Sequence, residues 1–264
     1  MSTVANLFTS LNLISGIIAI VFALMGRLDL APLVICFGAI FDFFDGFFAR
    51  MSKQNSELGK QLDSLSDIVT FGVAPGIIML VVLVIDISEI DSKTTAVDIS
   101  NQIQVWFDNL FLGNPNLLPF AGLIIPFFTL FRLAKFNITD NQTHYFIGLP
   151  APMNTFFFML FPLIISIEIK NVILSKILLP LFNPYFLSFL MIFMGFLMIS
   201  KIRLLAFKFT YFRIKGNEIR VSFLLISLLF ILLFKVWSIA LIVFLYIILS
   251  TIENIIFKKN KDEI

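Results

Sequence analysis

Residues 42–67 read DFFDGFFARMSKQNSELGKQLDSLSD and separate two apolar runs, Leu30–Phe41 and Ile68–Ile85. A carboxylate close to membrane hydrocarbon is costly unless it has a partner, a water-filled cavity or a metal ion. The stretch nevertheless holds four aspartates at helical spacing, with two glycines and an arginine: Asp42, Asp45, Gly46, Arg50, Gly59, Asp63 and Asp67. It therefore predicts a functional site at a membrane boundary.

The composition of the whole chain is typical of a membrane protein. Of its 264 residues, 59% are hydrophobic and only 14% are charged, and the mean hydropathy is +1.00. A soluble domain of this size would need more charge to cover its surface. We therefore predict an all-α, polytopic bundle of transmembrane helices. We expect no nucleic-acid partner, and the single cysteine, Cys36, excludes a disulfide within the chain.

A helix needs about 20 mostly apolar residues to cross roughly 30 Å of hydrocarbon. Eight segments are candidates for such spans, at about 7–26, 30–50, 64–86, 116–135, 152–169, 184–201, 219–234 and 237–257. With the N-terminus inside, 14 of the 19 Lys and Arg residues fall on the inner side and 5 on the outer side. The positive-inside rule therefore predicts that both termini are cytoplasmic. Residues 86–114 would form one long, acidic outer loop.

The spacing of the aspartates predicts how they converge. Asp42 and Asp45 are three residues apart, and Asp63 and Asp67 are four apart, so each pair lies on one face of its helix. A short loop at residues 51–58 would bring the two faces together. Converging carboxylates repel one another unless a cation lies among them, and oxygen ligands favour Mg²⁺, Mn²⁺ or Ca²⁺ over zinc. Two ions sharing carboxylates would suit a displacement at phosphorus.

The residues between the two pairs fit the same interpretation. Gly46 and Gly59 each lie one helical turn from an aspartate, Asp42 and Asp63 respectively, and leave room for a ligand against the backbone. Close helix packing is the alternative role for these glycines. Arg50 would hold a phosphate or orient a carboxylate. Its alternative role is that of a surface residue extending to the headgroup layer.

The pattern D-x2-D-G-x2-A-R-x8-G-x3-D-x3-D at residues 42–67 resembles the motif of the CDP-alcohol phosphotransferases at every fixed position. The resemblance implies a homodimer with six core transmembrane helices. Here residues 1–201 would form that core, and residues 202–264 would add a basic loop and two helices. Two divalent ions, Mg²⁺ or Mn²⁺, would hold the pyrophosphate of a CDP-linked donor. Their implied ligands are Asp42, Asp45, Asp63 and Asp67.

The resemblance also implies further roles in this site. Asp67 would be the general base that takes the proton of the acceptor alcohol. Asn6, Thr9 and Asn12 form a polar stripe at the start of the first span, and the family's N-terminal helix contributes to the nucleotide pocket. The alternative role for this stripe is helix–helix hydrogen bonding. The implied CDP-binding residues are Asn6, Thr9, Asp42, Gly46, Ala49, Arg50 and Gly59.

Two more stretches resemble the bacterial phosphatidylserine synthases within this family. They are DSLSDIVTFGVAP at 63–75, and RLAKFN at 132–137 followed by FIGLP at 146–150. Lys135 stands where arginine is usual, so charge is kept but a bidentate grip is not. The resemblance covers about residues 5–155. It implies CDP-diacylglycerol as donor, L-serine as acceptor, and a site at the cytoplasmic face of a bacterial cytoplasmic membrane.

The expected acceptor site consists of Arg132, Lys135 and Asn137. Arg132 and Lys135 lie on one helix face, and such a cationic pair would hold the carboxylate of serine. The alternatives are contacts to lipid headgroups or to the donor phosphates. Other acceptors remain open: choline, glycerol 3-phosphate or an inositol phosphate. A different class, an ion-coupled transporter, would use the acids as a cation path, but all four cluster at one membrane face.

Overall fold

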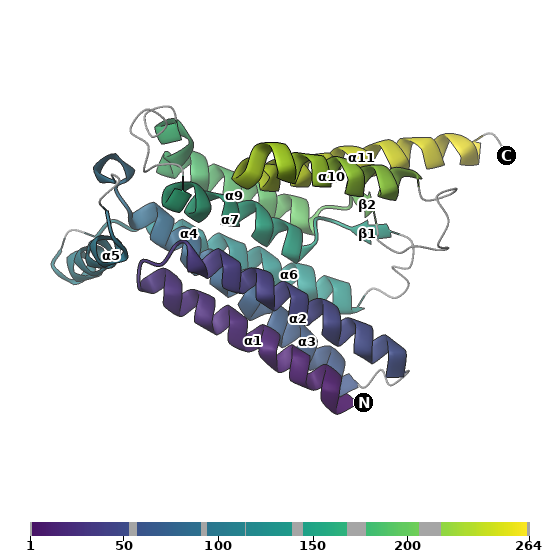
Figure 1. The fold of residues 1–264 in the computed structure, drawn as a ribbon, viewed down its shortest axis with the longest axis horizontal. Coiled ribbons are helices and arrows are strands. Elements are labelled where there is room, and N and C mark those ends of the chain that lie inside the picture. Colours follow the sequence, from purple (N-terminus) through teal and green to yellow (C-terminus); the bar gives the residue numbers. More distant parts are fainter. Residues whose placement is uncertain are drawn as a thin grey trace.

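The structure, a computed structural model, describes residues 2–52, 57–90, 94–113, 115–138, 145–167, 178–205 and 218–262. Helices make up nearly all of this part, which confirms the predicted all-α, polytopic helical membrane protein (Figure 1). The sequence did not predict a small two-stranded ribbon. Its strands β1 (Tyr145–Ile147) and β2 (Arg203–Leu205) are antiparallel, with Phe146 opposite Leu204.

The first half of the chain contains the helices that carry the aspartates. Helices α1 and α2 form a hairpin, and α3 continues into α4 through a π-helical turn, Val69–Val73. The bounds are α1 (Ser2–Leu24), α2 (Leu30–Ser52), α3 (Glu57–Ile68), α4 (Ala74–Val84), α5 (Ala96–Phe111) and α6 (Ile124–Ile138), with 3-10 turns at Ile87–Glu89 and Leu118–Leu123.

The second half packs two shorter helices and a long hairpin against the first. Its elements are α7 (Ala151–Ile167), a 3-10 turn at Leu179–Phe182, α9 (Pro184–Ile199), α10 (Glu218–Phe234), a 3-10 turn at Lys235–Trp237 and α11 (Ser238–Asp262). Lys235 has a φ of 48°, in the left-handed region, and the chain reverses there. The predicted break between the last two spans at this lysine is therefore confirmed.

Each of the eight expected spans coincides with a helical segment. Five helices in the described residues are long and apolar enough to cross a membrane, and Arg220–Glu253, which covers most of α10 and of α11, counts as one of them. Helices α7 and α9 are apolar but shorter, at 17 and 16 residues. The expected outer loop differs from the prediction, because it contains α5. A capping box between Thr95 and Asp98 satisfies the first backbone groups of that helix.

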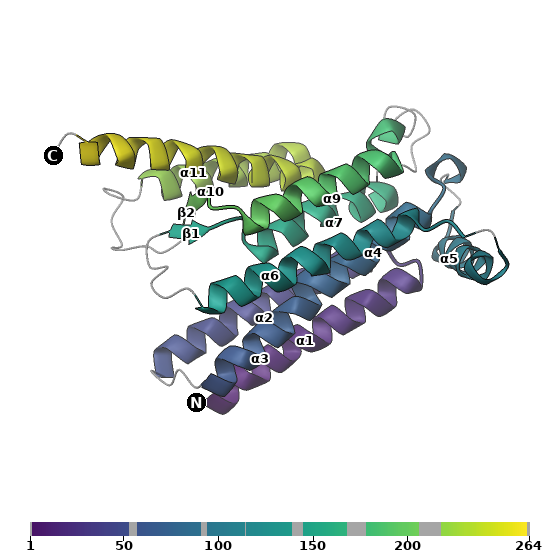
Figure 2. The same ribbon diagram turned by 180° about the vertical axis from the view of Figure 1, so that it is seen from behind.

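The start of α1 and the end of α11 lie at the same end of the bundle. Figures 1 and 2 show the N-terminus, the end of α2, the start of α3 and the end of α11 together at one end, with α5 at the other. The aspartates of α2 and α3 belong to the former end. The charge count predicts the same arrangement, with both termini on one side of the membrane.

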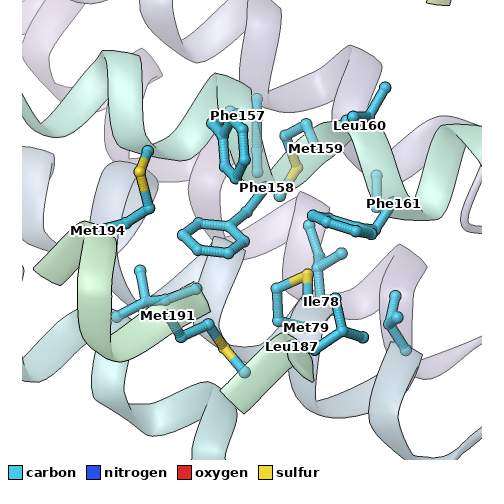
Figure 3. Close-up of a cluster of buried hydrophobic side chains, with 14 of the residues drawn as sticks. Ile78, Met79, Phe157, Phe158, Met159, Leu160, Phe161, Leu187, Met191 and Met194 are labelled. Atoms are coloured by element: carbon cyan, nitrogen blue, oxygen red, sulfur yellow. The ribbon is translucent and has the colours of Figure 1, made fainter. Parts of the chain in front are cut away.

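The interior is built on α4, α7 and α9. Ile78 and Met79 from α4 pack with Phe158 from α7 and with Met191 and Leu187 from α9 (Figure 3). Each of these side chains is at most 1% exposed. In contrast, α1, α2 and α10 present many large apolar side chains on their outer faces. The apolar outer surface fits a chain that is surrounded by lipid.

Two glycines allow α4 and the turn before α6 to approach each other closely. A Cβ atom added to Gly122 would overlap the carbonyl oxygen of Gly76 and come within 2.7 Å of the backbone nitrogen of Leu80. Glycine therefore lets the turn before α6 pack directly on the backbone of α4, as small residues commonly do between membrane helices.

Candidate active site

Three of the four aspartates meet between α2 and α3. Carboxylate oxygens of Asp42, Asp63 and Asp67 all lie within 4.8 Å of one another, and the three residues are partly buried. The i, i+4 spacing places Asp63 and Asp67 on one face of α3, and α2 brings Asp42 to that face. The predicted convergence of the two helices is thus present for these three residues.

The fourth aspartate, Asp45 on α2, is less exposed to solvent and does not belong to that group. It is 5% exposed, and its carboxylate interacts with the side chain of Thr9. Both Asp45 Oδ2 and Asp63 Oδ1 are buried without a hydrogen-bond partner among the described residues. Buried, unpaired carboxylate oxygens are costly. The donor set of hard oxygens with open positions therefore fits a divalent cation such as Mg²⁺ or Mn²⁺.

Helix α1 contacts the acid group directly through Asn12. This side chain is fully buried, and its Nδ2 donates a hydrogen bond of 3.1 Å to Asp67 Oδ1. Two hydroxyl groups join the same helices: Ser66 Oγ donates to the carbonyl of Thr9 at 2.9 Å, and Thr70 Oγ1 donates to that of Asn12 at 2.8 Å. These contacts hold α1 and the α3 segment in one register.

The π-helical turn, Val69–Val73, begins two residues after Asp67 and contains Thr70. A Cβ atom added to Gly16 would come within 2.6 Å of Thr70 Oγ1, and one added to Gly38 within 2.7 Å of Thr70 Cγ2. Thr70 therefore lies where α1 and α2 both approach the turn. Single π-turns inside α-helices often occur at functional sites, because they change which side chains face a neighbour.

The expected CDP-binding residues lie around the same end of α1, α2 and α3. Thr9 is 6% exposed beside Asp45, and Asn6 is half-buried one turn before it. On α2, the Arg50 guanidinium lies over Gly46, 3.3 Å from where a Cβ atom would be. Ala49 on α2 and Gly59 in the first turn of α3 are half-buried.

The expected acceptor residues, all on α6, contact different neighbouring segments. Arg132 is 5% exposed, its Nε donates to the carbonyl of Leu149 at 3.3 Å, and its guanidinium lies 5.4 Å from the ring centre of Phe136. Lys135 Nζ donates to the carbonyl of Ile199 at 3.3 Å. Arg132 thus binds a backbone oxygen next to strand β1, and Lys135 binds one at the end of α9.

Asn137 lies on another side of α6 and reaches α3. Its Nδ2 donates to Ser64 Oγ at 2.7 Å, and its carbonyl accepts from Lys60 Nζ at 2.8 Å. Five residues along a helix of 3.6 residues per turn amount to a rotation of about 140°, so Asn137 and Arg132 do not share a face. The structure therefore places Asn137 next to the acid-bearing helix but does not gather the three expected acceptor residues into one group.

Comparison with known proteins identifies the family. The sequence model of the CDP-alcohol phosphatidyltransferase family matches residues 2–187. The chain belongs to this family. It is 31% identical over 156 residues to the CDP-diacylglycerol–serine O-phosphatidyltransferase of Bacillus subtilis, which covers 58% of this chain and 71% of that protein. It is 28% identical over 264 residues to the enzyme of that name from Helicobacter pylori, covering 97% and 95%.

An archaeal relative extends this similarity. The archaetidylserine synthase of Methanothermobacter thermautotrophicus is 29% identical over 150 residues, or 56% of this chain and 52% of that protein. Membership of the phosphatidyltransferase family confirms the predicted resemblance and speaks against the transporter hypothesis. The matched region contains the elements that carry the site, from α1 to the start of α9, whereas α10 and α11 lie beyond it.

Sequence reasoning missed two contacts of this candidate site. Asn12 was recognised only as part of a polar stripe, although it is the residue that binds Asp67. Ser64 was not singled out, although it joins Asn137 to the acid-bearing helix. The signal for Asn12 was its place in the repeat Asn6, Thr9, Asn12, which predicts one polar helix face. No local signal pairs Ser64 with a residue 73 positions away.

Proposed function

We propose that this phosphatidyltransferase transfers the phosphatidyl group of CDP-diacylglycerol to L-serine, giving phosphatidylserine and CMP. The bond that forms joins the serine hydroxyl oxygen to phosphorus, and the bond that breaks joins that phosphorus to CMP. The observation that carries the proposal is the group of three carboxylates within 4.8 Å at one end of the bundle, in a chain whose relatives bear the names of serine-utilising enzymes.

We propose Asp42, Asp45, Asp63 and Asp67 as ligands for two divalent ions, Mg²⁺ or Mn²⁺. Support comes from the converging oxygens of three of them and from the unpaired, buried oxygens of Asp45 and Asp63. Bound cations would neutralise charge on the phosphoryl oxygens and on the departing CMP. The proposed CDP contacts are those expected from the sequence: Asn6, Thr9, Asp42, Gly46, Ala49, Arg50 and Gly59.

Asp67 is the proposed general base. It is the last acid of the motif, it lies in the carboxylate group, and Asn12 holds one of its oxygens. A hydroxyl is a weak nucleophile at neutral pH, and a carboxylate that takes its proton as the new bond forms contributes typically about 10²–10⁴-fold to the rate. The proton of the serine hydroxyl would therefore pass to Asp67.

Arg132 is the strongest candidate for holding the carboxylate of serine, with Lys135 and Asn137 beside it. Its side chain is nearly buried, and only Nε of its guanidinium has a hydrogen-bond acceptor among the described residues. A guanidinium with open terminal nitrogens is suited to bidentate binding of a carboxylate. Lys135 and Asn137 already bind neighbouring backbone or side-chain atoms, so their proposed part is to complete the pocket.

The proposed setting is the cytoplasmic membrane of a bacterium, with the site at the cytoplasmic face and both termini inside. The charge count favours this orientation, and the shared location of both termini and the aspartate-bearing helix ends supports it (Figures 1 and 2). We also propose a homodimer, with residues 1–201 as the catalytic core and residues 202–264 as an added region. Of the expected basic loop, residues 206–217 lie outside the described part of the chain.

An acceptor panel tests the proposal. Purified protein would be incubated with CDP-diacylglycerol, Mg²⁺ or Mn²⁺, and one acceptor at a time: L-serine, choline, glycerol 3-phosphate or an inositol phosphate. We expect phosphatidylserine, identified by mass, as the main lipid product, and no product in EDTA or with Asp63→Asn. Transfer to another acceptor without phosphatidylserine would overturn the serine assignment while leaving the family chemistry in place.

A further inference from the structure

The role of Asn12 is not explained by packing alone. The side chain is 0% exposed, whereas its polar neighbours Thr9 and Ser15 are 6% exposed. Their hydroxyl groups bond to carbonyl groups one turn back in α1. A buried amide is costly unless both of its polar atoms are hydrogen-bonded. Here Oδ1 has no partner among the described residues, whereas Nδ2 donates to Asp67 Oδ1 at 3.1 Å. The only side-chain hydrogen bond of Asn12 among the described residues is therefore the one that its Nδ2 donates to Asp67.

The orientation of this amide follows from its partner. If the amide were turned over, its oxygen would face the carboxylate oxygen of Asp67, and two acceptors would repel. The donor must consequently point at Asp67, and the amide oxygen points toward α2. A Cβ atom added to Gly38 on α2 would lie 3.3 Å from that oxygen and 2.7 Å from Thr70 Cγ2. A side chain at this glycine would thus press on Asn12 and Thr70 together.

The attachment of α1 to the α3 segment does not depend on the Asn12 side chain. The hydroxyl groups of Ser66 and Thr70 already bond to backbone carbonyls of α1. Both of these bonds use backbone atoms of α1, so they would survive a change of side chain at position 12. The Asn12 amide adds a contact to one carboxylate of the acid group and nothing else among the described side chains.

We propose that Asn12 is a positioning residue for Asp67, which it holds by one carboxylate oxygen, and that Gly38 provides the space that keeps Asn12 in place. The inference deepens the proposed function, in which Asp67 binds metal and serves as base. With Oδ1 held, the carboxylate cannot rotate freely, and Oδ2 keeps a fixed position for a cation or a hydroxyl proton. Partners that hydrogen-bond a metal ligand typically change affinity or activity by about 10–100-fold when they are removed.

The test replaces Asn12 by leucine, which has nearly the same size and no polar atoms. The full-length protein would be purified in detergent, and its thermal unfolding midpoint would be measured against Mn²⁺ concentration, with the metal alone as probe. We expect Asn12→Leu to fold as well as the parent without metal, because an apolar side chain suits a buried site. The Mn²⁺ concentration that gives half of the stabilisation should rise about 10–100-fold.

Kinetics and a control variant separate positioning from packing. With CDP-diacylglycerol and serine, Asn12→Leu should lower kcat by a similar factor and leave the donor KM nearly unchanged. Asn12→Leu combined with Asp67→Asn should be no worse than Asp67→Asn alone, since both changes act on one carboxylate. The control is Ser15→Ala, one turn along α1, where the hydroxyl bonds only to the carbonyl of Leu11. It should match the parent in both assays.

Several outcomes would overturn the inference. Asn12→Leu with the Mn²⁺ response and kcat of the parent would do so, as would fully additive losses in the double variant. If Asn12→Leu does not fold, Gly38→Ala provides the test, because this variant keeps the Asn12 amide but displaces it. A weaker Mn²⁺ response in Gly38→Ala would support the positioning role of Asn12. A Mn²⁺ response equal to that of the parent would contradict this role. A parent that binds Mn²⁺ but makes no phosphatidylserine would refute the proposed acceptor only, since the metal titration still reports on Asn12.

Discussion

At the scale of single residues, the four aspartates have similar chemistry but different surroundings. Asp42, Asp63 and Asp67 form the group within 4.8 Å, and Asp67 alone among them receives the side-chain hydrogen bond from Asn12. Asp45 lies apart from the group, with Thr9 beside it. Equal substitutions at these positions should therefore have unequal effects.

The first prediction compares Asp67→Asn with Asp63→Asn. An amide is a poor ligand for a hard cation and cannot take a proton. Asp63→Asn should abolish activity mainly through loss of metal binding, which is measured by the Mn²⁺-dependent unfolding midpoint. Asp67→Asn should depress kcat about 10²–10⁴-fold and weaken donor binding much less. A loss confined to donor affinity would reduce Asp67 to a metal ligand.

The second prediction concerns Arg132→Ala. A charge-assisted hydrogen bond is worth roughly 1.5–3 kcal/mol, so kcat/KM for serine should fall about tenfold to a hundredfold. Serinol lacks the carboxylate, and its already low kcat/KM should fall much less. Because Arg132 also binds the carbonyl of Leu149, an equal loss for serine and serinol would instead indicate that this residue supports the turn before α7.

At the scale of secondary-structure elements, the segment from α3 to α4 determines the geometry of the site. Its π-turn begins two residues after Asp67 and places Thr70 against α1 and α2. Its next turns pack through Gly76 against Gly122, so that α6 lies close to α4. The aspartates thus lie on the α3 half of an element whose α4 half is anchored in the interior.

The third prediction tests that anchor with Gly122→Ala. The added methyl group would meet backbone atoms of α4, which cannot move aside as a flexible side chain can. Overpacking of this kind costs typically about 1–3 kcal/mol, so the thermal unfolding midpoint in detergent should fall. Leu123→Met is the matched control, because Leu123 is 43% exposed on the same turn. Equal midpoints for both variants would show that the two elements separate easily.

At the scale of the whole molecule, the start of α1 and the end of α11 lie at the end of the bundle that carries the acids. Helix α5 lies at the opposite end and has acidic Asp98 and Asp108 but no basic residue. The positive-inside rule then predicts that α5 is outside the cell and the aspartates inside. Serine made in the cytoplasm would reach the site without crossing the membrane.

The fourth prediction tests this orientation by cysteine labelling in a Cys36→Ser background. Asn101→Cys, on the exposed side of α5, should react with an impermeant thiol reagent added to intact cells. Lys201→Cys and Leu58→Cys are exposed at the other end and should react only after lysis. The reverse pattern would place the aspartates on the outer face and contradict the proposed cytoplasmic site.

The sequence alone determined the properties that depend on neighbouring residues. Apolar runs located the helices, the spacing of Asp63 and Asp67 placed them on one face, and Lys235 marked the reversal between the last two spans. The sequence also carries a signal from which the start of helix α5 could have been predicted, because Thr95 and Asp98 form a capping box. These features could be predicted because hydropathy, helical period and capping act within a few residues.

Only the tertiary structure decided which residues meet across helices. Asn12 binds Asp67 55 positions away, and Arg132 and Lys135 bind backbone oxygens of distant segments, Leu149 and Ile199. The π-turn after Asp67 has no marker that sequence analysis recognised. Such contacts depend on how closely two helices pack and on their relative rotation, which small residues such as Gly38 set through steric contact. Helical period reports which face a residue occupies, and packing alone determines what that face touches.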